Sequence, residues 1–349
     1  MFIVLSLGTQ YYIYTRLRAA DINKYVLRLF IAWAVFWIVA GVISGFDLSH
    51  SEYDIFPLHT TEILNAAFLT WAIITLLGFF AFFIVNLLPI KHKIFFSTML
   101  TILATLYGIG EAYFVTTRYI TIPTNKLPEG IDKLRLAYIT DSHIGGLSTH
   151  WHFERTMRLV KEADPDIFIS TGDTIDGDMS YRERELELLS EAAKNSRYGA
   201  FAVNGNHEHY WILDEDVEGI IRQCGFNLLI NERVEAAGII IIGLDDIRYG
   251  WLKPFLRPGD ENKFVLVLKH RPGLPIDADG KFDLQLSGHT HGGQFWPLGY
   301  FKNFASKSTQ GLSRKAGGYV YVSNGSGFNG AMLRLFVPPE ITVIDIVRK

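Results

Sequence analysis

The chain has 349 residues, and its 33 basic and 36 acidic side chains give a net charge of −3. This length allows two or three domains, and the charge excludes the strongly basic surface typical of nucleic-acid-binding proteins. The single cysteine, Cys224, excludes an intramolecular disulfide. Aromatic residues make up 14% of the chain and the mean hydropathy is +0.17, which is high for a soluble enzyme. Because the apolar excess lies in the first third, we expect membrane helices followed by a soluble domain.

Long uncharged segments in the first third predict four membrane-spanning helices. Leu29 to Phe46 and Ile63 to Ile90 carry no charged residue, and Ile94 to Thr117 carries only Glu111. A spanning helix needs roughly 20 apolar residues, so all three segments qualify. Met1 to Thr15 is shorter, and we interpret it as a first span with tyrosines at the interface. A signal peptide is the alternative, but the basic residues follow this segment instead of preceding it.

The charges in the loops predict how these spans are oriented. The first and third loops are basic, whereas the loop from Asp47 to Glu62 has four acidic residues and no Lys or Arg. Basic loops stay in the cytoplasm, so the C-terminal domain is expected on the extracytoplasmic side of the membrane. The last three spans alone give the same orientation.

Three polar residues of the membrane region invite a functional reading. Glu111 lies near the outer end of the last span, and we interpret it as a side chain that reaches the interface, not as a functional intramembrane group. His50 and His59 could bind a metal, but no third ligand is spaced with them. We therefore expect these two histidines to be solvated.

The rest of the chain predicts a linker and a soluble domain. We assign residues 1–117 to the transmembrane domain, 118–133 to a Pro-containing linker and 134–349 to the soluble domain. Short β-rich runs are expected at 134–140, 166–171, 200–203, 238–243, 264–268, 282–286, 319–322 and 341–347. Helices are expected at 149–164, 182–195 and 217–223. This pattern favours two sheets packed together with helices outside.

Polar clusters follow five of the predicted strands. They are Asp141-Ser142-His143, Gly172-Asp173-Thr174-Ile175-Asp176, Gly205-Asn206-His207-Glu208, His270, and Ser287-Gly288-His289-Thr290-His291. In open α/β sheets ligands bind at the carboxyl ends of the strands. These oxygen and nitrogen donors are sufficient in number for two divalent metals. A cluster of structural polar residues is the alternative, but it does not explain so many ligand-type side chains at strand ends.

The five clusters, in this order, resemble the motifs of the calcineurin-like metallophosphoesterase family. The resemblance covers Leu134 to the C-terminus, and five ordered motifs are far more specific than any one of them. Gly292-Gly293-Gln294 and the segment Arg334 to Glu340 are similar to a membrane-anchored bacterial branch of that family. The resemblance implies a four-layer αββα sandwich of the α/β (α+β) class, following the all-α transmembrane bundle. It also implies a protein of the bacterial cytoplasmic membrane.

The resemblance further implies a role for each site residue. Asp141, His143 and His291 would hold the first metal, Asn206, His270 and His289 the second, and Asp173 would bridge them. The mixed nitrogen and oxygen donors suit Mn, Fe or Zn. A hydroxide between two metals would attack the phosphorus. His207 would bind the phosphate or protonate the leaving group.

Other residues near the motifs carry weaker expectations. We interpret Asp176 as a helix cap or as a partner of a ligand, and Glu208 and His209 as cleft or loop residues. His150 and His152 are expected to face solvent. Phe295, Trp296 and Tyr300 are expected to pack over the site, although they could hold an acyl chain or a base. The Gly-rich turn at 324–327 could approach phosphate.

The function predicted from these features is a membrane-anchored phosphoesterase. Its substrate could be a phosphodiester, a pyrophosphate or a phosphomonoester, because one site fold serves all three. A short linker keeps the domain near the lipid bilayer, which favours a lipid-linked or envelope substrate. The alternative is a membrane sensor or scaffold whose metal site only binds, but no motif is degraded. A transport role is disfavoured, because the spans lack paired charges.

Overall fold

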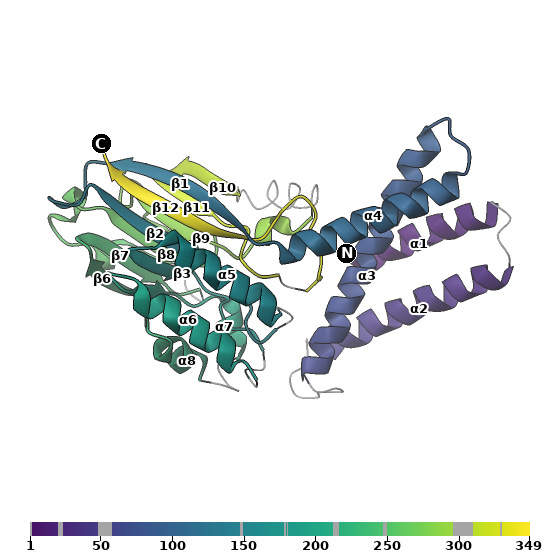
Figure 1. Ribbon diagram of the computed structural model, residues 1–349, viewed down its shortest axis with the longest axis horizontal. Helices are drawn as coiled ribbons and strands as arrows, with labels where there is room; N and C mark the ends of the chain where they lie inside the picture. Colours follow the sequence, from purple (N-terminus) through teal and green to yellow (C-terminus); the bar gives the residue numbers. More distant parts are fainter. Residues whose placement is uncertain are drawn as a thin grey trace. The chain divides into compact units, whose positions relative to one another are not determined.

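The computed structural model describes residues 2–19, 24–47, 58–146, 149–177, 179, 181–211, 216–246, 250–295, 310–328 and 330–349. The chain divides into two compact units, whose elements are labelled in Figure 1. The first unit combines Met1–Ala112 with Asn329–Leu335, and the second combines Tyr113–Phe328 with Phe336–Lys349. The domain boundaries inferred from the sequence stay predictions, and no sequence pattern indicates that residues 329–335 return to the first unit.

Four helices begin the chain, each formed by one of the uncharged segments. They are α1 (Phe2–Ala19), α2 (Lys24–Asp47), α3 (Leu58–Leu87) and α4 (Lys93–Tyr113). Helix α3 packs against both α1 and α2. Between α1 and α3, Gln10 Nε2 donates a 2.9 Å hydrogen bond to Thr75 Oγ1. A polar pair bonded inside a helical unit is how such groups are satisfied where lipid offers no partner.

Two of these helices are long and apolar enough to cross a membrane. They are Ala66–Leu87 within α3 and Lys93–Tyr113, which is all of α4. The spans expected at Met1 to Thr15 and Leu29 to Phe46 are largely helical, and their membrane location stays a prediction. The last expected span was drawn too long, because Thr116 and Thr117 belong to a strand. Residues 48–57, with His50, and the side chain of His59 lie outside the described residues.

A short segment from the C-terminal part of the chain packs in the first unit. The backbone N–H of Arg334 donates a 3.0 Å hydrogen bond to the carbonyl of Gly108 in α4. A Cβ at Gly108 would lie 2.8 Å from the Arg334 carbonyl oxygen, so glycine is needed for this close approach. The backbone N–H of Met332 donates to Thr70 Oγ1 of α3 at 3.1 Å. Residues 330–335 are therefore structurally part of the helical unit.

The second unit contains two six-stranded mixed sheets. The first sheet has the order β1 (Thr116–Thr124), β12 (Glu340–Arg348), β2 (Lys133–Ile139), β3 (Ile167–Ser170), β4 (Ala200–Ala202), β5 (Phe226–Leu228). The second has the order β10 (Gly311–Lys315), β11 (Gly318–Val322), β9 (Leu284–Ser287), β8 (Val265–Lys269), β7 (Ile239–Leu244), β6 (Glu232–Ala236). All eight strands expected from the sequence are present, and the two sheets add β1, β5, β6 and β10 to them.

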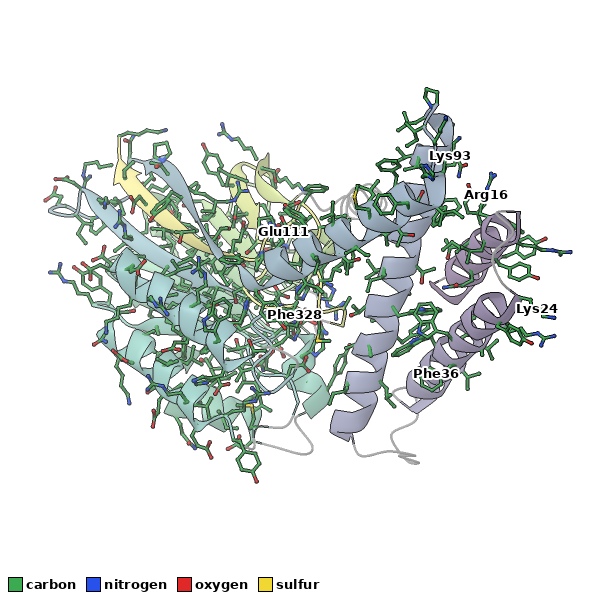
Figure 2. All side chains as sticks on the ribbon, turned by 45° about the vertical axis from the view of Figure 1, so that its right-hand side comes forward. Arg16, Lys24, Phe36, Lys93, Glu111 and Phe328 are labelled. Atoms are coloured by element: carbon green, nitrogen blue, oxygen red, sulfur yellow. The ribbon has the colours of Figure 1, made fainter. Side chains whose placement is uncertain are left out.

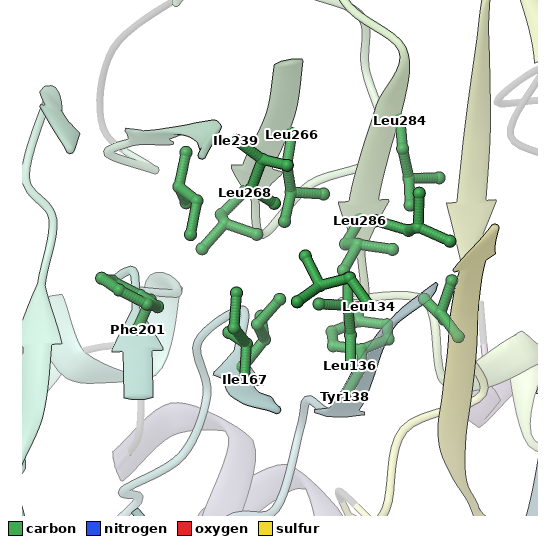
Figure 3. Close-up of a cluster of buried hydrophobic side chains, with 14 of the residues drawn as sticks. Leu134, Leu136, Tyr138, Ile167, Phe201, Ile239, Leu266, Leu268, Leu284 and Leu286 are labelled. Carbon is green, nitrogen blue, oxygen red and sulfur yellow. The ribbon is translucent and has the colours of Figure 1, made fainter. Parts of the chain in front are cut away.

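The main hydrophobic core lies between the two sheets. Alternate residues of β2, such as Leu134, Leu136 and Tyr138, face Leu266 and Leu268 of β8 and other residues of the second sheet (Figure 3). All five of these side chains are fully buried. Alternation with a period of two puts one set of side chains in this core and the other on the outer face of each sheet. This packing holds the parallel strands β2, β3, β8 and β9 in one sandwich.

Helices cover only one outer face of the sandwich in the described part of the chain. Helix α5 (His150–Ala163), α6 (Glu183–Asn195) and α8 (Val217–Gln223) bury their apolar stripes against the first sheet. The outer face of the second sheet is covered by Leu252, Phe255, Ala278 and neighbouring turns, including the 3₁₀ helix Lys253–Phe255. The segment 250–283 contains four prolines, which do not fit inside an α-helix. On this face, turns and a short 3₁₀ helix take the place of the outer helical layer expected in a four-layer sandwich.

Strand β1 occupies the first seven residues, 118–124, of the linker expected at 118–133. It pairs in parallel with β12 from Thr116 opposite Glu340 to Thr124 opposite Arg348. It contains four threonines and two isoleucines, and such β-branched residues favour strands. Pro123 lies in an edge strand, where a missing N–H is tolerated. The first strand of the second unit is therefore an edge strand of the first sheet.

Candidate metal centre

The candidate ligands lie in loops at the carboxyl ends of five parallel strands. Strand β2 leads to Asp141 and His143, β3 to Asp173, β4 to Asn206 and His207, β8 to His270, and β9 to His289 and His291. Six of the seven candidate ligands are buried, and His289 is half-buried. Six of them, without Asn206, form three groups together with His207, with the ligand-type atoms of each group within 4.8 Å of one another: Asp141, His143 and His291; His143, Asp173 and His207; Asp173, His270 and His289. The structure thus brings together ligands that the sequence separates by up to 150 positions.

The first group has the geometry of ligands around one cation. The Nε2 atoms of His143 and His291 lie 3.1 Å apart, and His291 Nε2 lies 3.5 Å from Asp141 Oδ1. Histidine nitrogens bind zinc at ~2.0–2.1 Å, so two of them on one cation lie roughly 3.0–3.4 Å apart. Asp141 also accepts the backbone N–H of His289 at 2.9 Å, which orients its carboxylate.

The second group repeats this spacing on the other side of Asp173. His270 Nε2 lies 3.2 Å from His289 Nδ1 and 3.1 Å from Asp173 Oδ2. His270 Nδ1 donates to the carbonyl of Thr171 at 2.8 Å, so its Nε2 is the atom available to a metal. Asp173 belongs to two of the three groups, as a bridging ligand would.

Asn206 supplies an independent test of whether a metal fits. Its Oδ1 atom is buried and has no hydrogen-bond partner among the described residues. An unsatisfied buried acceptor costs about 1–3 kcal/mol, and a cation would relieve this cost. Asn206 is the first residue of α7 (Asn206–Trp211), next to His207, whose N–H donates to Asp173 Oδ1 at 2.9 Å. The donor set present here fits divalent cations.

Asp176 orients two of the histidines. It accepts from His143 Nδ1 at 2.9 Å and from His207 Nδ1 at 2.7 Å. Burial opposes the ionisation of Asp176, but hydrogen bonds from these two histidines outweigh it and lower the pKa of the carboxyl. A carboxylate cannot donate, so the Nδ1 atoms of both histidines carry the protons. The Nε2 atoms are then the ones available to the group formed with Asp173. Asp176 is thus a partner of a ligand and does not cap a helix.

We expect Asp176→Asn to lower metal affinity by about 10- to 100-fold, the usual effect of losing the carboxylate behind a ligand histidine. Asparagine keeps one acceptor oxygen, and its NH2 group faces the other histidine N–H, which it cannot accept. Competition with a fluorescent chelator measures the affinity. Asp132→Asn is the matched control, because the Asp132 side chain is 91% exposed. Equal affinities in both variants would show that Asp176 does not orient the ligands.

The ligand loops adopt backbone conformations that L-residues rarely take. Asp141, His143, Asp173, His289 and His291 have φ angles between 48° and 68°. This left-handed region costs a non-glycine residue about 1–2 kcal/mol, and such conformations cluster at functional sites. The second unit therefore stores backbone strain at the centre, which its packing must offset.

The buried charges favour a cation at this position. Burial lowers the pKa of His270, but the charges of Asp173 and Asp141 raise it to about 10. Burial together with the charges of His270 and Arg271 lowers the pKa of His289 to about 4, so this ring is neutral and can donate its lone pair. The potential at Asp173 thus attracts positive charge, whether a proton or a metal.

His207 lies against the cluster but differs from its ligands. Its Nε2 lies 4.0 Å from Asp173 Oδ2, and its ring meets the ring of His143 edge to face at 4.7 Å between centroids. Burial lowers the pKa of His207, but the hydrogen bond and charge of Asp176 raise it to about 9. His207 can therefore hold a proton on Nε2 at neutral pH, facing the centre.

Glu208 has a structural role that the sequence analysis did not recognise. Its side chain is buried and accepts four backbone N–H groups, from Asp173 at 2.8 Å, Thr174 at 2.6 Å, Ile175 at 3.1 Å and Gly205 at 2.7 Å. One carboxylate thus ties the loop after β3 to the loop after β4. Its fixed place in Gly-Asn-His-Glu was the only signal in the sequence.

Other expectations require correction. His152 is 1% exposed, and its Nε2 hydrogen-bonds the carbonyl of Ser326 at 2.6 Å, whereas His150 is exposed as expected. The turn at 324–327 is buried against the Asp141 loop, where the N–H of Gly327 donates to the Asp141 carbonyl at 2.9 Å. This turn supports a ligand loop, and its approach to phosphate stays a prediction. Phe295 is buried, while Trp296 and Tyr300 lie outside the described residues.

Comparison with known proteins identifies the same part of the chain. A family model described as calcineurin-like phosphoesterase matches residues 134–293. An uncharacterised metallophosphoesterase of Aquifex aeolicus is 34% identical over 261 residues, covering 72% of this chain and 98% of that protein. The metallophosphoesterase YkuE of Bacillus subtilis is 26% identical, covering 68% of this chain and 87% of that protein.

One similar vertebrate protein is named as a transmembrane protein. The transmembrane protein with metallophosphoesterase domain of Danio rerio is 29% identical over 273 residues, covering 71% of this chain and 61% of that protein. The Aquifex relative is matched over nearly its whole length, and the residues matched by the family model include the five clusters that converge in the structure. We conclude that this chain belongs to the calcineurin-like metallophosphoesterase family and is a metal-dependent phosphoester hydrolase.

Proposed function

We propose that this protein is a membrane-anchored phosphoesterase with a two-metal centre and that it acts on a lipid-linked or envelope substrate. The observation that carries the two-metal proposal is the pair of ligand spacings on either side of Asp173. His143 and His291 approach to 3.1 Å, and His270 and His289 to 3.2 Å. Asp141, His143 and His291 would hold one cation, and Asn206, His270 and His289 the other, with Asp173 shared.

Two divalent cations of Mn, Fe or Zn would supply Lewis acidity and an acidified water when bound. Other residues of the chain hold the candidate ligands and His207 in position. Asp176 orients His143 and His207, and Glu208 shapes the loop that carries Asp173. The buried environment keeps bulk water away from these groups, which strengthens their electrostatic effect on the phosphoryl group.

His207 is the proposed general acid. It carries a proton at neutral pH. It shares one group with His143 and Asp173 but is not among the residues proposed to hold a cation. Protonating the leaving alkoxide contributes most when that group is a strong base, because a weakly basic leaving group departs without help. This dependence distinguishes proton donation from phosphate binding.

We expect His207→Asn to lower kcat for an alkyl phosphoester by about 10²- to 10⁴-fold and to lower kcat for a p-nitrophenyl ester far less. Steady-state kinetics on the two esters measures the difference. His209→Asn is the matched control, because His209 pairs with Asp245 at 2.8 Å outside the three ligand groups. An equal loss on both esters would contradict the general-acid role.

The surface of α4 supports anchoring in a membrane. Phe95, Leu103 and Leu106 are 64%, 55% and 61% exposed, although a soluble protein would bury such side chains. Phe114 directly follows this helix in the sequence. The ring of Phe114 meets the ring of Trp151 at 6.5 Å, and the guanidinium of Arg155 lies 5.4 Å from the Phe114 ring. Tryptophan, tyrosine and cationic side chains typically mark a membrane interface.

Basic residues support the proposed orientation. Arg16, Lys24 and Lys93 lie toward the same end of the helical unit (Figure 2). The loops after α1 and α3 would then both be cytoplasmic by the positive-inside rule. With four spans, the second unit would be extracytoplasmic in a multi-pass protein. Protease protection of the second unit in right-side-out and inverted vesicles tests this assignment.

We expect Trp151→Ala to lower kcat/KM for a phospholipid substrate in vesicles by about two- to tenfold, because one aromatic contact is worth about 0.5–1.5 kcal/mol. Turnover of a soluble p-nitrophenyl ester should not change. Trp251→Ala is the matched control, since Trp251 is 51% exposed and Trp151 is 50% exposed. Good turnover of soluble nucleotides with none of any lipid phosphoester would contradict the lipid-linked substrate.

A further inference from the structure

A second charged cluster lies beside the metal centre and takes no part in the ligand groups. Arg271 directly follows His270 after β8, and Asp246 follows the neighbouring parallel strand β7. Leu244 and Lys269, the last residues of β7 and β8, are paired with each other. Asp246 and Arg271, two residues further along each chain segment, therefore lie at the same edge of the sheet as the centre. No motif noted in the sequence includes either residue.

Arg271 is held in place through one of its three nitrogens. Its Nε lies 3.0 and 2.8 Å from the two carboxylate oxygens of Asp246, whose side chain is 4% exposed. Lys269 Nζ donates to the Arg271 carbonyl at 3.0 Å, which fixes the backbone. Among the described residues, the terminal Nη1 and Nη2 groups of Arg271 have no partner. Four N–H donors in a planar fork therefore remain for another group.

Arg271 is next to a buried candidate ligand in the sequence and is itself open to solvent. The Arg271 side chain is 45% exposed, whereas the candidate ligands beside it, His270 and Asp173, are buried. Burial lowers the pKa of Arg271, and Asp246, Tyr210 and Asp173 raise it. The guanidinium is therefore close enough to Asp173 for their charges to interact. Tyr210 is 64% exposed, and its ring meets that of His207 at 5.3 Å. Two exposed side chains, Tyr210 and Arg271, therefore lie next to members of the buried cluster.

An exposed arginine beside an aspartate is often only a surface ion pair with little effect on stability. This pair differs, because the carboxylate is buried and engages Nε alone, leaving the terminal groups directed away from it. Planar Nη pairs recognise phosphate and carboxylate groups in a bidentate manner. If the candidate metal centre binds one phosphoryl group, the Nη groups of Arg271 remain free to bind a second group of the same substrate.

We propose that Arg271 binds a second anionic group of the substrate, which lies beyond the phosphoryl group that is cleaved. The inference rests on the proposed function of the centre and narrows its substrate class. The preferred substrates are phosphoesters or phosphoanhydrides with two anionic groups, and a simple monoester lacks the second. Asp246 is a positioning residue for Arg271, and neither residue contacts the phosphorus that reacts.

Calorimetric titration of the metal-loaded, full-length protein with imidodiphosphate and with inorganic phosphate tests the inference. Imidodiphosphate carries two linked phosphoryl groups and resists hydrolysis, and free metal is kept in excess. We expect Arg271→Ala to weaken imidodiphosphate binding by about 10- to 100-fold, the effect of losing a charge-assisted bidentate contact. Phosphate affinity should change less than threefold. Arg271→Lys and Asp246→Asn should give smaller losses in the same direction.

Turnover of bis(p-nitrophenyl) phosphate by the same variants separates the two proposals. Unchanged turnover with weakened imidodiphosphate binding supports the assigned role of Arg271. An equal loss for both anions, or no loss for either, would overturn it. If wild-type protein binds imidodiphosphate in an Arg271-dependent way but hydrolyses no ester, the proposed function fails while the role of Arg271 stands.

Discussion

Replacing Asp173 by asparagine is expected to lower kcat/KM by at least about 10³-fold, because metal ions contribute several kcal/mol to stabilising the transition state. Asp173 groups with His143 on one side and with His270 and His289 on the other, so its loss is expected to affect both candidate cations. Asparagine keeps an oxygen that accepts the N–H of His207, now 2.9 Å from Asp173 Oδ1, which limits structural damage. The metal content of the purified variant should fall below that of the wild type.

Asp277→Asn is the matched control for this substitution. Asp277 accepts the backbone N–H groups of Leu252 and Lys253 at 2.7 and 2.9 Å on the outer face of the second sheet. The same chemical change there should leave metal content and kcat/KM unchanged. An Asp173→Asn variant with wild-type metal content and activity within about tenfold of the wild type would exclude a bridging role.

Glu208→Ala is expected to produce the largest loss of stability. Four buried backbone N–H groups would lose their acceptor, and each unsatisfied donor costs about 1–3 kcal/mol. A total of about 4 kcal/mol or more lowers Tm by roughly 10 °C, since 1 kcal/mol corresponds to about 2–4 °C in a unit of this size. Thermal unfolding of the full-length protein measures this shift.

Two further variants sharpen the stability test. Glu208→Gln keeps the volume, but its NH2 group faces the same N–H donors, so we expect an intermediate loss. Glu187→Ala is the surface control, because Glu187 is 68% exposed and pairs with Arg184, and its effect should stay within about 0.5 kcal/mol. A Glu208→Ala variant as stable as the control would show that water replaces the carboxylate.

The sequence predicted the central strands of the sandwich but not its margins. The four strands that it did not indicate, β1, β5, β6 and β10, are the outermost strands of the two sheets. Edge strands are half exposed, so Glu232–Ala236 and Gly311–Lys315 contain no fully buried residue and lack an apolar run. Strand β5 has only three residues, which is too short for a periodic signal.

The candidate ligands could be predicted because they occur in short, ordered motifs at the ends of apolar runs. The residues that support them could not. Glu208 accepts N–H groups from a loop more than 30 positions earlier, and Asp246 meets Arg271 across 25 positions. Such partners are chosen by the fold, and only the assembled sheet edge shows which side chains face each other. The positive φ angles of the ligand loops are likewise imposed by packing.

Histidine environments show the same limit. His150 and His152 are both polar residues near the start of one helix, yet one is exposed and the other is 1% exposed. Helical periodicity places them on different faces, but the sequence does not show that the turn at 324–327 covers the second face. The buried acceptor at the Ser326 carbonyl makes His152 part of the second unit's interior.

Metal titration of the chelator-treated, full-length protein tests the central claim most directly. Hydrolysis of bis(p-nitrophenyl) phosphate is followed while Mn²⁺ is added and bound metal is counted. The two-metal centre predicts no turnover without metal, and full turnover only when two cations are bound per chain. Full turnover without metal, or saturation of both binding and turnover at one cation per chain, would contradict it.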